Sequence, residues 1–352
     1  YGNIVLELAN EDLSLLDGYN YIVLGSTTEE QSITIENEEI SLEELYNAHC
    51  ETLEPIFPTK SVDIKEKIET INFISQGEAK KSSITIAKPR VFIPTFPGTN
   101  CEYDLQRAFE KAGANTNIEV FKNLTYKDIE DSTETIVKQI RKSQIIMLPG
   151  GFSAGDEPDG SAKFMATVFR NPKVAEAVNE FLTKQDGLML GICNGFQALI
   201  KLGLVPYGEI RETTVDAPTL TYNNIGRHQS KIVRTRIASN KSPWLKATEV
   251  GDTHSIAISH GEGKFVASEE VMRQLIANGQ IATQYVDFND NATYDIDFNP
   301  NGSTYAVEGI TSADGRIFGK MGHSERVGEH VIKNIIGEKD QKIFESGVNY
   351  FK

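Results

Sequence analysis

Residues 187–203 have the sequence GLMLGICNGFQALIKLG. An apolar run stops at Cys193 and then continues with helical periodicity, which predicts a strand, a tight turn and a helix. The G-x-C-x-G spacing of residues 191–195 is that of a nucleophile elbow with cysteine in place of serine. Such a turn exposes the thiol, the helix N-terminus favours the thiolate, and the N–H of Asn194 points toward a developing oxyanion. The alternative is a buried structural cysteine, because free cysteines are often buried.

The chain around this elbow alternates strands and helices joined by short connections. Apolar runs predict parallel strands at residues 90–94, 117–121, 144–151 and 187–193. Helical periodicity predicts helices at residues 100–112, with Asn100 as the cap and Gly113 as the stop, and at 132–143, 171–185 and 194–203. This pattern indicates an α/β fold with a parallel sheet covered by helices on both faces.

The chain becomes rich in predicted strands beyond residue 207. These strands are expected at 219–224, 231–238, 256–268, 280–287, 305–312 and 316–321. The segment EHVIKNIIG, residues 329–337, is expected to form a C-terminal helix. Ligands bind at the carboxyl ends of the strands in open α/β sheets, so residues that follow strands are the candidate site residues.

The first 83 residues are acidic and irregular. A strand is expected at residues 19–26, and residues 32–53 are expected to form a strand that leads into a helix capped by Ser41, with Glu44 completing a capping box. The polar stretch 77–83 suits a linker, which divides the chain into residues 1–83 and 84–352. The start, YGNIVLELANEDL, has no Met and no signal-peptide pattern, and we expect the chain to be a fragment of a longer polypeptide.

Composition narrows the functional class. The 352 residues carry a formal charge of −15, which disfavours nucleic acid as a partner. No apolar run approaches the roughly 18 residues needed to span a membrane. The three cysteines, Cys50, Cys101 and Cys193, are widely spaced and odd in number, so neither a disulfide framework nor a metal site is indicated, and a reducing cytoplasmic compartment is expected. Cys101 is interpreted as structural, because no histidine and carboxylate pattern accompanies it.

A base for Cys193 is found in GKMGHSER, directly after a predicted strand. Among the six histidines, His323 alone follows a strand of the α/β region and has a carboxylate, Glu325, two residues later. In an extended chain, residues two apart point to the same side, so Glu325 can orient His323. A third feature, LPGGFSAGD, places Gly150 and Gly151 after a strand as a candidate second half of an oxyanion hole.

These motifs together resemble class I (triad-type) glutamine amidotransferases, a flavodoxin-like fold, and more narrowly the glutaminase domains of phosphoribosylformylglycinamidine synthases of purine biosynthesis. The resemblance covers about Arg90 to Phe351 and includes PTFPGTNCEYD and SHGEGKF. It implies that Cys193 is the nucleophile, His323 the proton shuttle and Glu325 its orienting partner. It also implies that Gly150, Gly151, Asn194 and Gln197 bind glutamine or the oxyanion, Gln197 being alternatively a polar residue on the helix surface.

The resemblance has further implications. Residues 1–83 resemble the tail of the synthetase part of the large single-chain enzyme, whose ATP and Mg²⁺ sites would lie upstream, so that no cofactor is expected in this fragment. The partners expected are glutamine and those upstream synthetase domains. Two departures concern the site: Gly322 and Ser324 stand where relatives have prolines, which raises the question of how the base is held, and Ala154 stands where tyrosine is common.

Rival interpretations remain at this stage. The same scaffold carries other triad amidotransferases and Cys-His-Glu peptidases, and a non-catalytic docking module could retain the fold. The sequence leaves open the oligomeric state, the ammonia route, whether the fragment is active alone and whether residues 1–83 fold independently. It also leaves open the roles of His254 and His260, which are either ordinary loop histidines or part of the site entrance.

Overall fold

The structure is a computed structural model that describes residues 2–9, 13–59, 61, 66–76, 81–153, 155 and 161–352. Contacts between Cα atoms divide the chain into two units, Tyr1–Thr59 and Lys60–Lys352. The predicted linker at 77–83 lies partly outside the described residues. A domain boundary at residues 83 and 84 stays a prediction.

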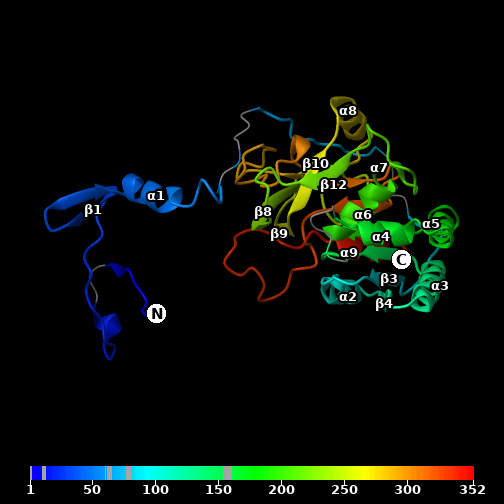
Figure 1. The fold of residues 1–352 in the computed structure, drawn as a ribbon, viewed down its shortest axis with the longest axis horizontal. Helices are drawn as coiled ribbons and strands as arrows, with labels where there is room; N and C mark the ends of the chain where they lie inside the picture. Colours follow the sequence, from blue (N-terminus) through cyan, green and yellow to red (C-terminus); the bar gives the residue numbers. More distant parts are fainter. Residues whose placement is uncertain are drawn as a thin grey trace. The chain divides into compact units, whose positions relative to one another are not determined.

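The first unit contains little regular structure. Its described elements are the 3-10 helix η2 (Leu13–Leu16), the hairpin of β1 (Ser32–Ile35) and β2 (Glu38–Ser41), and helix α1 (Leu42–Glu51) (Figure 1). Ser41 caps α1 as predicted, because its hydroxyl accepts a hydrogen bond from the N–H of Glu44 at 3.1 Å. The strand predicted at 19–26 is wrong: these residues are irregular, and apolar side chains such as Ile22 are 85 % exposed. None of the described residues up to Thr59 is buried.

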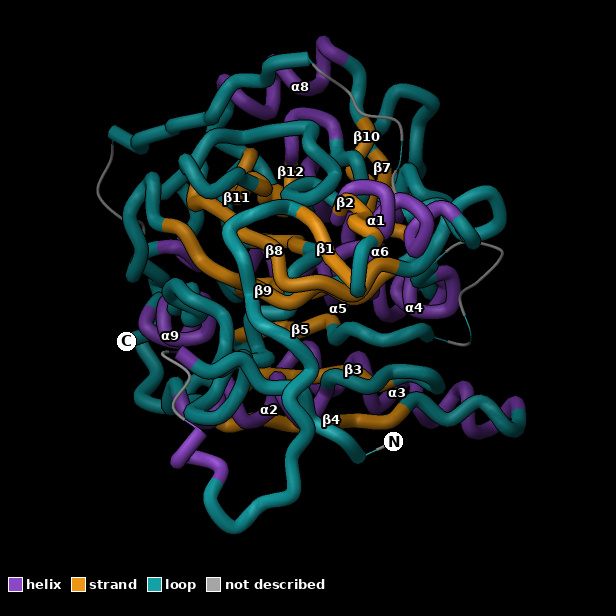
Figure 2. The backbone as a smooth tube through the Cα atoms, turned by 90° about the vertical axis from the view of Figure 1, so that its left-hand side faces the viewer, coloured by secondary structure: helices purple, strands orange, loops and turns teal. Residues whose placement is uncertain are grey.

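The second unit is built on one mixed sheet of nine strands in the order β4-β3-β5-β6-β13-β12-β11-β8-β9. The first five strands in this order (β4, β3, β5, β6 and β13) are parallel to one another. The pairs from β13 onward, through β12, β11 and β8 to β9, are antiparallel. Figure 2 shows β3, β4 and β5 side by side. The strand bounds are β3 (Arg90–Thr95), β4 (Asn115–Val120), β5 (Ile145–Leu148), β6 (Leu188–Ile192), β8 (Gln229–Ile237), β9 (Thr253–His260), β11 (Ile281–Tyr285), β12 (Val307–Thr311) and β13 (Ile317–Lys320). A separate antiparallel pair joins β7 (Thr219–Tyr222) to β10 (Glu262–Val266).

Helices cover both faces of the parallel half. The described helices of this unit are α2 (Glu102–Lys111), α3 (Tyr126–Lys142), α4 (Lys163–Phe169), α5 (Pro172–Lys184), α6 (Asn194–Leu202), α7 (Leu204–Tyr207), α8 (Glu269–Ala277), α9 (Ile343–Asn349), η3 (Pro243–Leu245) and η4 (Thr304–Ala306). The chain passes from β3 to the edge strand β4 through α2, and then returns through α3 to β5 on the other side of β3. Because the two crossovers run in opposite directions and both are right-handed, α2 and α3 lie on opposite faces of the sheet. Helix α9 packs with α2, where the rings of Phe109 and Phe344 meet edge to face at 5.0 Å, and α5 packs with α3.

The predicted α/β architecture is therefore confirmed, with two local corrections. Asn100 does not cap α2: the N-cap is Cys101, which makes no side-chain capping bond. The helix predicted at 329–337 is wrong, because these residues form turns and bends, and the last helix is α9. The side chain of Ile336 in this segment is 94 % exposed. An apolar repeat without a surface to pack against does not stabilise a helix.

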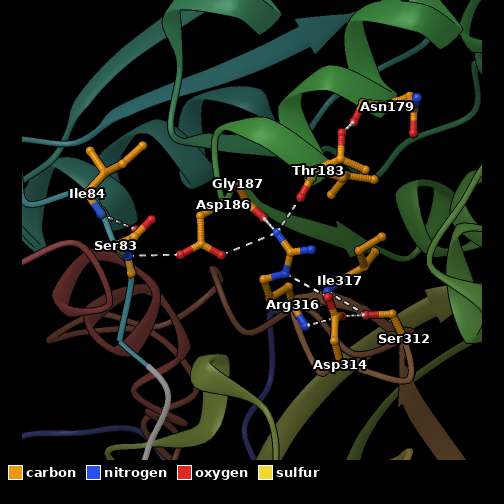
Figure 3. Close-up of polar contacts among 12 residues, drawn as sticks. Ser83, Ile84, Asn179, Thr183, Asp186, Gly187, Ser312, Asp314, Arg316 and Ile317 are labelled. Carbon is orange, nitrogen blue, oxygen red and sulfur yellow. Dashed lines mark hydrogen bonds and ion pairs between the residues drawn. The ribbon is translucent and has the colours of Figure 1, made fainter.

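Arg316 joins the segments that lead into β6 and β13. Its guanidinium donates to the carbonyl of Leu182 at 2.7 Å and to Asp314 at 2.7 Å, and it lies 3.5 Å from Asp186. Asp186 in turn accepts from the N–H of Ser83 at 3.1 Å (Figure 3). The network fixes the starts of two neighbouring strands whose other ends carry the candidate site.

In the part of the chain that the structure describes, no helix is long and apolar enough to cross a lipid bilayer.

Candidate active site

Cys193 lies at the sharp turn between β6 and α6. Its backbone has φ 52° and ψ −108°, a conformation that side-chain-bearing residues rarely adopt and that is held by the surrounding structure. The turn needs both of its glycines. A Cβ at Gly191 would lie 2.6 Å from the carbonyl oxygen of Gly195, and a Cβ at Gly195 would overlap the carbonyl of Leu148 at the end of β5. The predicted elbow is present, but the predicted exposure of its thiol is wrong, because Cys193 is only 5 % exposed.

His323 and Glu325 follow β13, the strand next to β6. The pairing of Lys320 with Ile192 brings the ends of these two strands together. His323 Nδ1 lies 2.6 Å from Glu325 Oε1, and both side chains are almost fully buried. Gly150 separates the base from the elbow: a Cβ built on it would lie 3.0 Å from His323 Cε1 and 3.5 Å from Cys193 Cβ. The structure therefore brings Cys193, His323, Glu325 and Gly150 into one cluster.

The environment of His323 favours its charged form. Burial by itself lowers the pKa of His323, but the charge of Glu325 and hydrogen bonds to Cys101, Cys193 and Glu325 outweigh it and raise the pKa well above the ordinary value of 6.5. Burial likewise raises the pKa of Glu325, but the charge and hydrogen bond of His323 lower it overall. An imidazolium–carboxylate pair is thus the preferred state of these two groups at neutral pH.

The glycine and serine that replace the expected prolines have their own partners. The N–H of Gly322 donates to Glu308 Oε1 at 2.6 Å, a bond that proline cannot make, and its carbonyl accepts from Lys320 Nζ at 2.7 Å. Glu308 and Lys320 form a fully buried ion pair at 3.0 Å. The hydroxyl of Ser324 donates to Gln341 at 2.6 Å. The loop of the base is therefore fixed by buried polar contacts.

Gly151 lies in a turn that packs tightly on the PGTN turn after β3. Its φ is 135°, and a Cβ there would come within 2.7 Å of the carbonyl oxygen of Gly98 and 2.8 Å of Thr99 Cα. The next N–H, that of Phe152, donates to Gly98 at 2.9 Å. Only glycine fits this close backbone approach. The oxyanion role of the N–H groups of Gly151 and Asn194 stays a prediction, and Ala154 lies outside the described residues.

Asn194 and Gln197 are linked to each other and to the β9–β10 turn. Asn194 Nδ2 donates to Gln197 Oε1 at 2.9 Å, and Asn194 Oδ1 accepts from the N–H of Ser153 at 3.3 Å. Gln197 Nε2 donates to the carbonyl of Glu262. Gln197 is 4 % exposed, so the alternative of a helix-surface residue is wrong. Its contact with glutamine stays a prediction.

Cys101, interpreted from sequence as structural, lies beside the base. Its Sγ is 3.9 Å from His323 Nδ1 and accepts from the guanidinium of Arg326 at 3.4 Å. The ligand atoms of Cys101, His323 and Glu325 lie within 4.8 Å of one another, close enough to hold a metal ion. The positive charge of Arg326 at the same sulfur opposes a cation there.

A comparison with protein families identifies the domain that contains these residues. Residues 88–351 match the model of a CobB/CobQ-like glutamine amidotransferase domain. The chain belongs to this glutamine amidotransferase family.

Two curated relatives of this amidotransferase are subunits of phosphoribosylformylglycinamidine synthase. The phosphoribosylformylglycinamidine synthase subunit PurQ of Campylobacter jejuni is 32 % identical over 263 residues, which is 74 % of this chain and 99 % of that protein. PurQ of Methanococcus maripaludis strain C5 is 34 % identical over 280 residues, 75 % of this chain and 96 % of the relative. Among solved structures, PurLQS from Thermotoga maritima matches with a TM-score of 0.54 at 28 % identity, over 75 % of this chain and 100 % of that chain.

The candidate site includes residues that sequence reasoning missed. Cys101 and Arg326 contact the base or its neighbour, and the Cys193 thiol donates to the carbonyl of Ser259 at 3.6 Å. Adjacency of parallel strand ends could have placed Cys101 near the site, because it follows β3 as Gly150 follows β5. The sequence offered the β9–β10 segment only as one of two alternatives, as a site entrance with His254 and His260, because its approach depends on the order of the antiparallel strands.

Proposed function

We propose that this chain hydrolyses glutamine at Cys193 and supplies the ammonia to the synthetase reaction of phosphoribosylformylglycinamidine synthase. Its family makes it a glutamine amidotransferase, the glutaminase part of that enzyme of purine biosynthesis. The observation that carries the catalytic assignment is the cluster in which the strained Cys193 elbow meets the His323–Glu325 pair across Gly150.

The proposed reaction uses a covalent thioester. In the reactive pair the proton of the Cys193 thiol resides on His323, and the thiolate attacks the side-chain carbonyl carbon of glutamine. The carbonyl oxygen develops negative charge that the N–H groups of Gly151 and Asn194 stabilise. His323, as imidazolium, gives its proton to the leaving nitrogen, and ammonia departs from the γ-glutamyl thioester. The neutral imidazole then takes a proton from water, whose oxygen attacks the thioester and releases glutamate, so that glutamine and water become glutamate and ammonia.

Glu325 acts as a positioning residue in this scheme. It accepts a hydrogen bond from His323 Nδ1, which directs Nε2 toward the reacting atoms. Its charge stabilises the imidazolium that forms in each cycle. These steps use protein side chains and water alone, so we assign ATP and Mg²⁺ to the synthetase part, where formylglycinamide ribonucleotide becomes the amidine.

We further infer that the synthetase domains belong to the same polypeptide and that residues 1–83 are their tail. The family match begins at residue 88, and the relatives are named as separate subunits. Support comes from the first unit, in which Ile4, Ile22 and Leu24 are each at least 80 % exposed. Apolar side chains of this kind need a partner surface. An immunoblot of native extract with antibody to residues 84–352 tests the inference. A band much larger than this chain is expected, and a band of the size of a separate glutaminase subunit contradicts the inference.

A cytoplasmic location is part of the same proposal. The mechanism needs a free thiol at Cys193, and the three cysteines, all free, include a second one, Cys101, at the site. A reducing compartment preserves both thiols.

The decisive experiment compares two nitrogen sources in the complete synthase. Cys193→Ala is expected to abolish glutamine-dependent formation of formylglycinamidine ribonucleotide and to leave the ammonia-dependent reaction unchanged. Cys50→Ala, which removes a half-buried thiol on α1, serves as the control and is expected to change neither. Equal loss of both reactions in Cys193→Ala contradicts the proposed division of labour.

A further inference from the structure

The turn that joins β9 to β10 lies against the elbow. The carbonyl of Ser259 accepts from the Cys193 thiol at 3.6 Å, and the carbonyl of Glu262 accepts from the side chain of Gln197. Gln197 lies about one helical turn, roughly 6 Å, along α6 from Cys193. Glu262 is three residues after Ser259, so the Cα atoms of these two residues are at most about 11 Å apart.

The carboxylate of Glu262 is only half satisfied. The residue is 4 % exposed, and its Oε2 accepts from the N–H of Ser161 at 2.9 Å. Its Oε1 is buried and has no hydrogen-bond partner among the described residues. Nor does any described cationic side chain form an ion pair with it. Burying a carboxylate without a cation or a full set of hydrogen-bond donors costs free energy. This cost points to a ligand with a positively charged donor group that binds Oε1.

The neighbouring histidine does not supply that charge. His260 is 1 % exposed, and its ring packs over Gly263. Burial, followed by the charges of His323 and His228, lowers the pKa of His260 to about 3, so the ring is neutral. Asn223 donates its amide N–H groups to two carbonyls, so its Oδ1 accepts from His260 Nδ1 at 3.1 Å. His260 Nε2 is then a second buried acceptor without a described partner.

Glutamine carries a suitable donor at a suitable distance. Its reacting carbonyl carbon must come within about 3.5 Å of the Cys193 sulfur. Its α-ammonium group lies three C–C bonds and one C–N bond away, about 5 Å in an extended side chain. The nitrogen therefore lies about 8–9 Å at most from the Cys193 sulfur, which the side chain of Glu262, three residues from the Ser259 that contacts this sulfur, can reach.

We propose that Glu262 binds the α-ammonium group of the substrate glutamine through its unpartnered Oε1. The assignment rests on the proposed glutaminase function and adds a specificity-determining residue to it. A γ-amide that lacks the α-ammonium group would leave Glu262 buried without its cation, so this contact selects free glutamine.

Covalent labelling of Cys193 in the complete synthase tests the proposal. One probe is 6-diazo-5-oxo-L-norleucine, which has an electrophilic carbon and an α-ammonium group, and the other is the same diazoketone acid without the amino group. We expect Glu262→Gln to slow labelling by the first probe about ten- to a hundredfold, as for loss of one charge-assisted hydrogen bond, and to leave the second unchanged. Glu270→Gln, which removes an exposed carboxylate on α8, is expected to change neither rate.

The outcomes separate the two proposals. Equal slowing of both probes in Glu262→Gln, or no slowing of either, overturns the ammonium site. Failure of both probes to label wild-type Cys193 while iodoacetamide still modifies it overturns the glutaminase assignment instead. Because the second probe reports on the integrity of the elbow in the same variant, a folding defect does not imitate the expected result.

Discussion

Glu308→Gln is expected to weaken both the stability of the second unit and the placement of the base. Glu308 forms a 3.0 Å ion pair with Lys320 in which both side chains are completely buried, and it accepts a further bond from the N–H of Gly322. Thr283 completes the network by donating to Glu308 Oε2 at 2.5 Å. The amide keeps the shape of the side chain but removes its charge, which leaves the ammonium group of Lys320 buried and uncompensated.

The magnitude follows from that burial. Breaking a buried ion pair by removing one charge costs about 3–5 kcal/mol. A domain of this size has a urea m-value near or above about 3 kcal/mol/M, so the unfolding midpoint is expected to fall by about 1–2 M. Glutamine-dependent activity is expected to fall as well, because Gly322 directly precedes His323.

Equilibrium urea unfolding, followed by tryptophan fluorescence of the buried Trp244, measures the loss. The matched control is Glu134→Gln, whose partner Lys173 lies 3.8 Å away with both side chains 69 % exposed, and its midpoint is expected to stay the same. The double variant Glu308→Gln/Lys320→Met removes the orphaned charge and is expected to regain part of the lost stability. A double variant less stable than Glu308→Gln, or equal midpoints for Glu308→Gln and the control, would refute the reasoning.

Three further predictions concern the site. Glu325→Gln removes the charge that keeps the pKa of His323 high, so His323 loses its proton at a lower pH. The alkaline limb of the glutaminase pH–rate profile is therefore expected to move to lower pH. An unmoved limb argues against His323 as the proton donor. Gly322→Pro removes the N–H whose hydrogen bond Glu308 accepts and is expected to lower the thermal unfolding temperature. An unchanged temperature would show that this bond contributes nothing. Gly195→Ala forces a methyl group into the main chain of β5 and is expected to abolish labelling of Cys193 by glutamine analogues, and normal labelling would contradict the described elbow.

The sequence predicted the parallel half of the sheet well because its signals are local. Buried apolar runs such as those of β5 and β6, followed by helical periodicity, specify strands and crossovers without knowledge of distant residues. The elbow at Cys193 was predictable for the same reason, since its glycines are required by backbone contacts within the turn and with the next strand. The His323–Glu325 pair was found because the two residues are close in sequence as well as in space.

The rest depended on long-range contacts. The order in which β12, β11, β8 and β9 extend the sheet is not encoded in any local pattern, so the sequence left the position of the Ser259 segment open between an ordinary loop and the site entrance. The segments at 19–26 and 329–337 have the apolar pattern of a strand and a helix, but their apolar side chains are largely exposed, and regular structure needs a packing partner. The position of Cys101 beside His323 was not predicted, because that histidine comes from the other end of the domain.

The position of β13 in the sheet gives the enzyme an order of assembly. Cys193 follows a strand that is complete at Ile192, whereas His323, its proposed base, follows a strand that begins at Ile317 and lies directly beside β6. A ribosome must therefore synthesise all of the antiparallel strands before nucleophile and base can meet. In the proposed mechanism, a growing chain that already contains Cys193 cannot release ammonia before His323 is made, so glutamine is spared until both residues are in place.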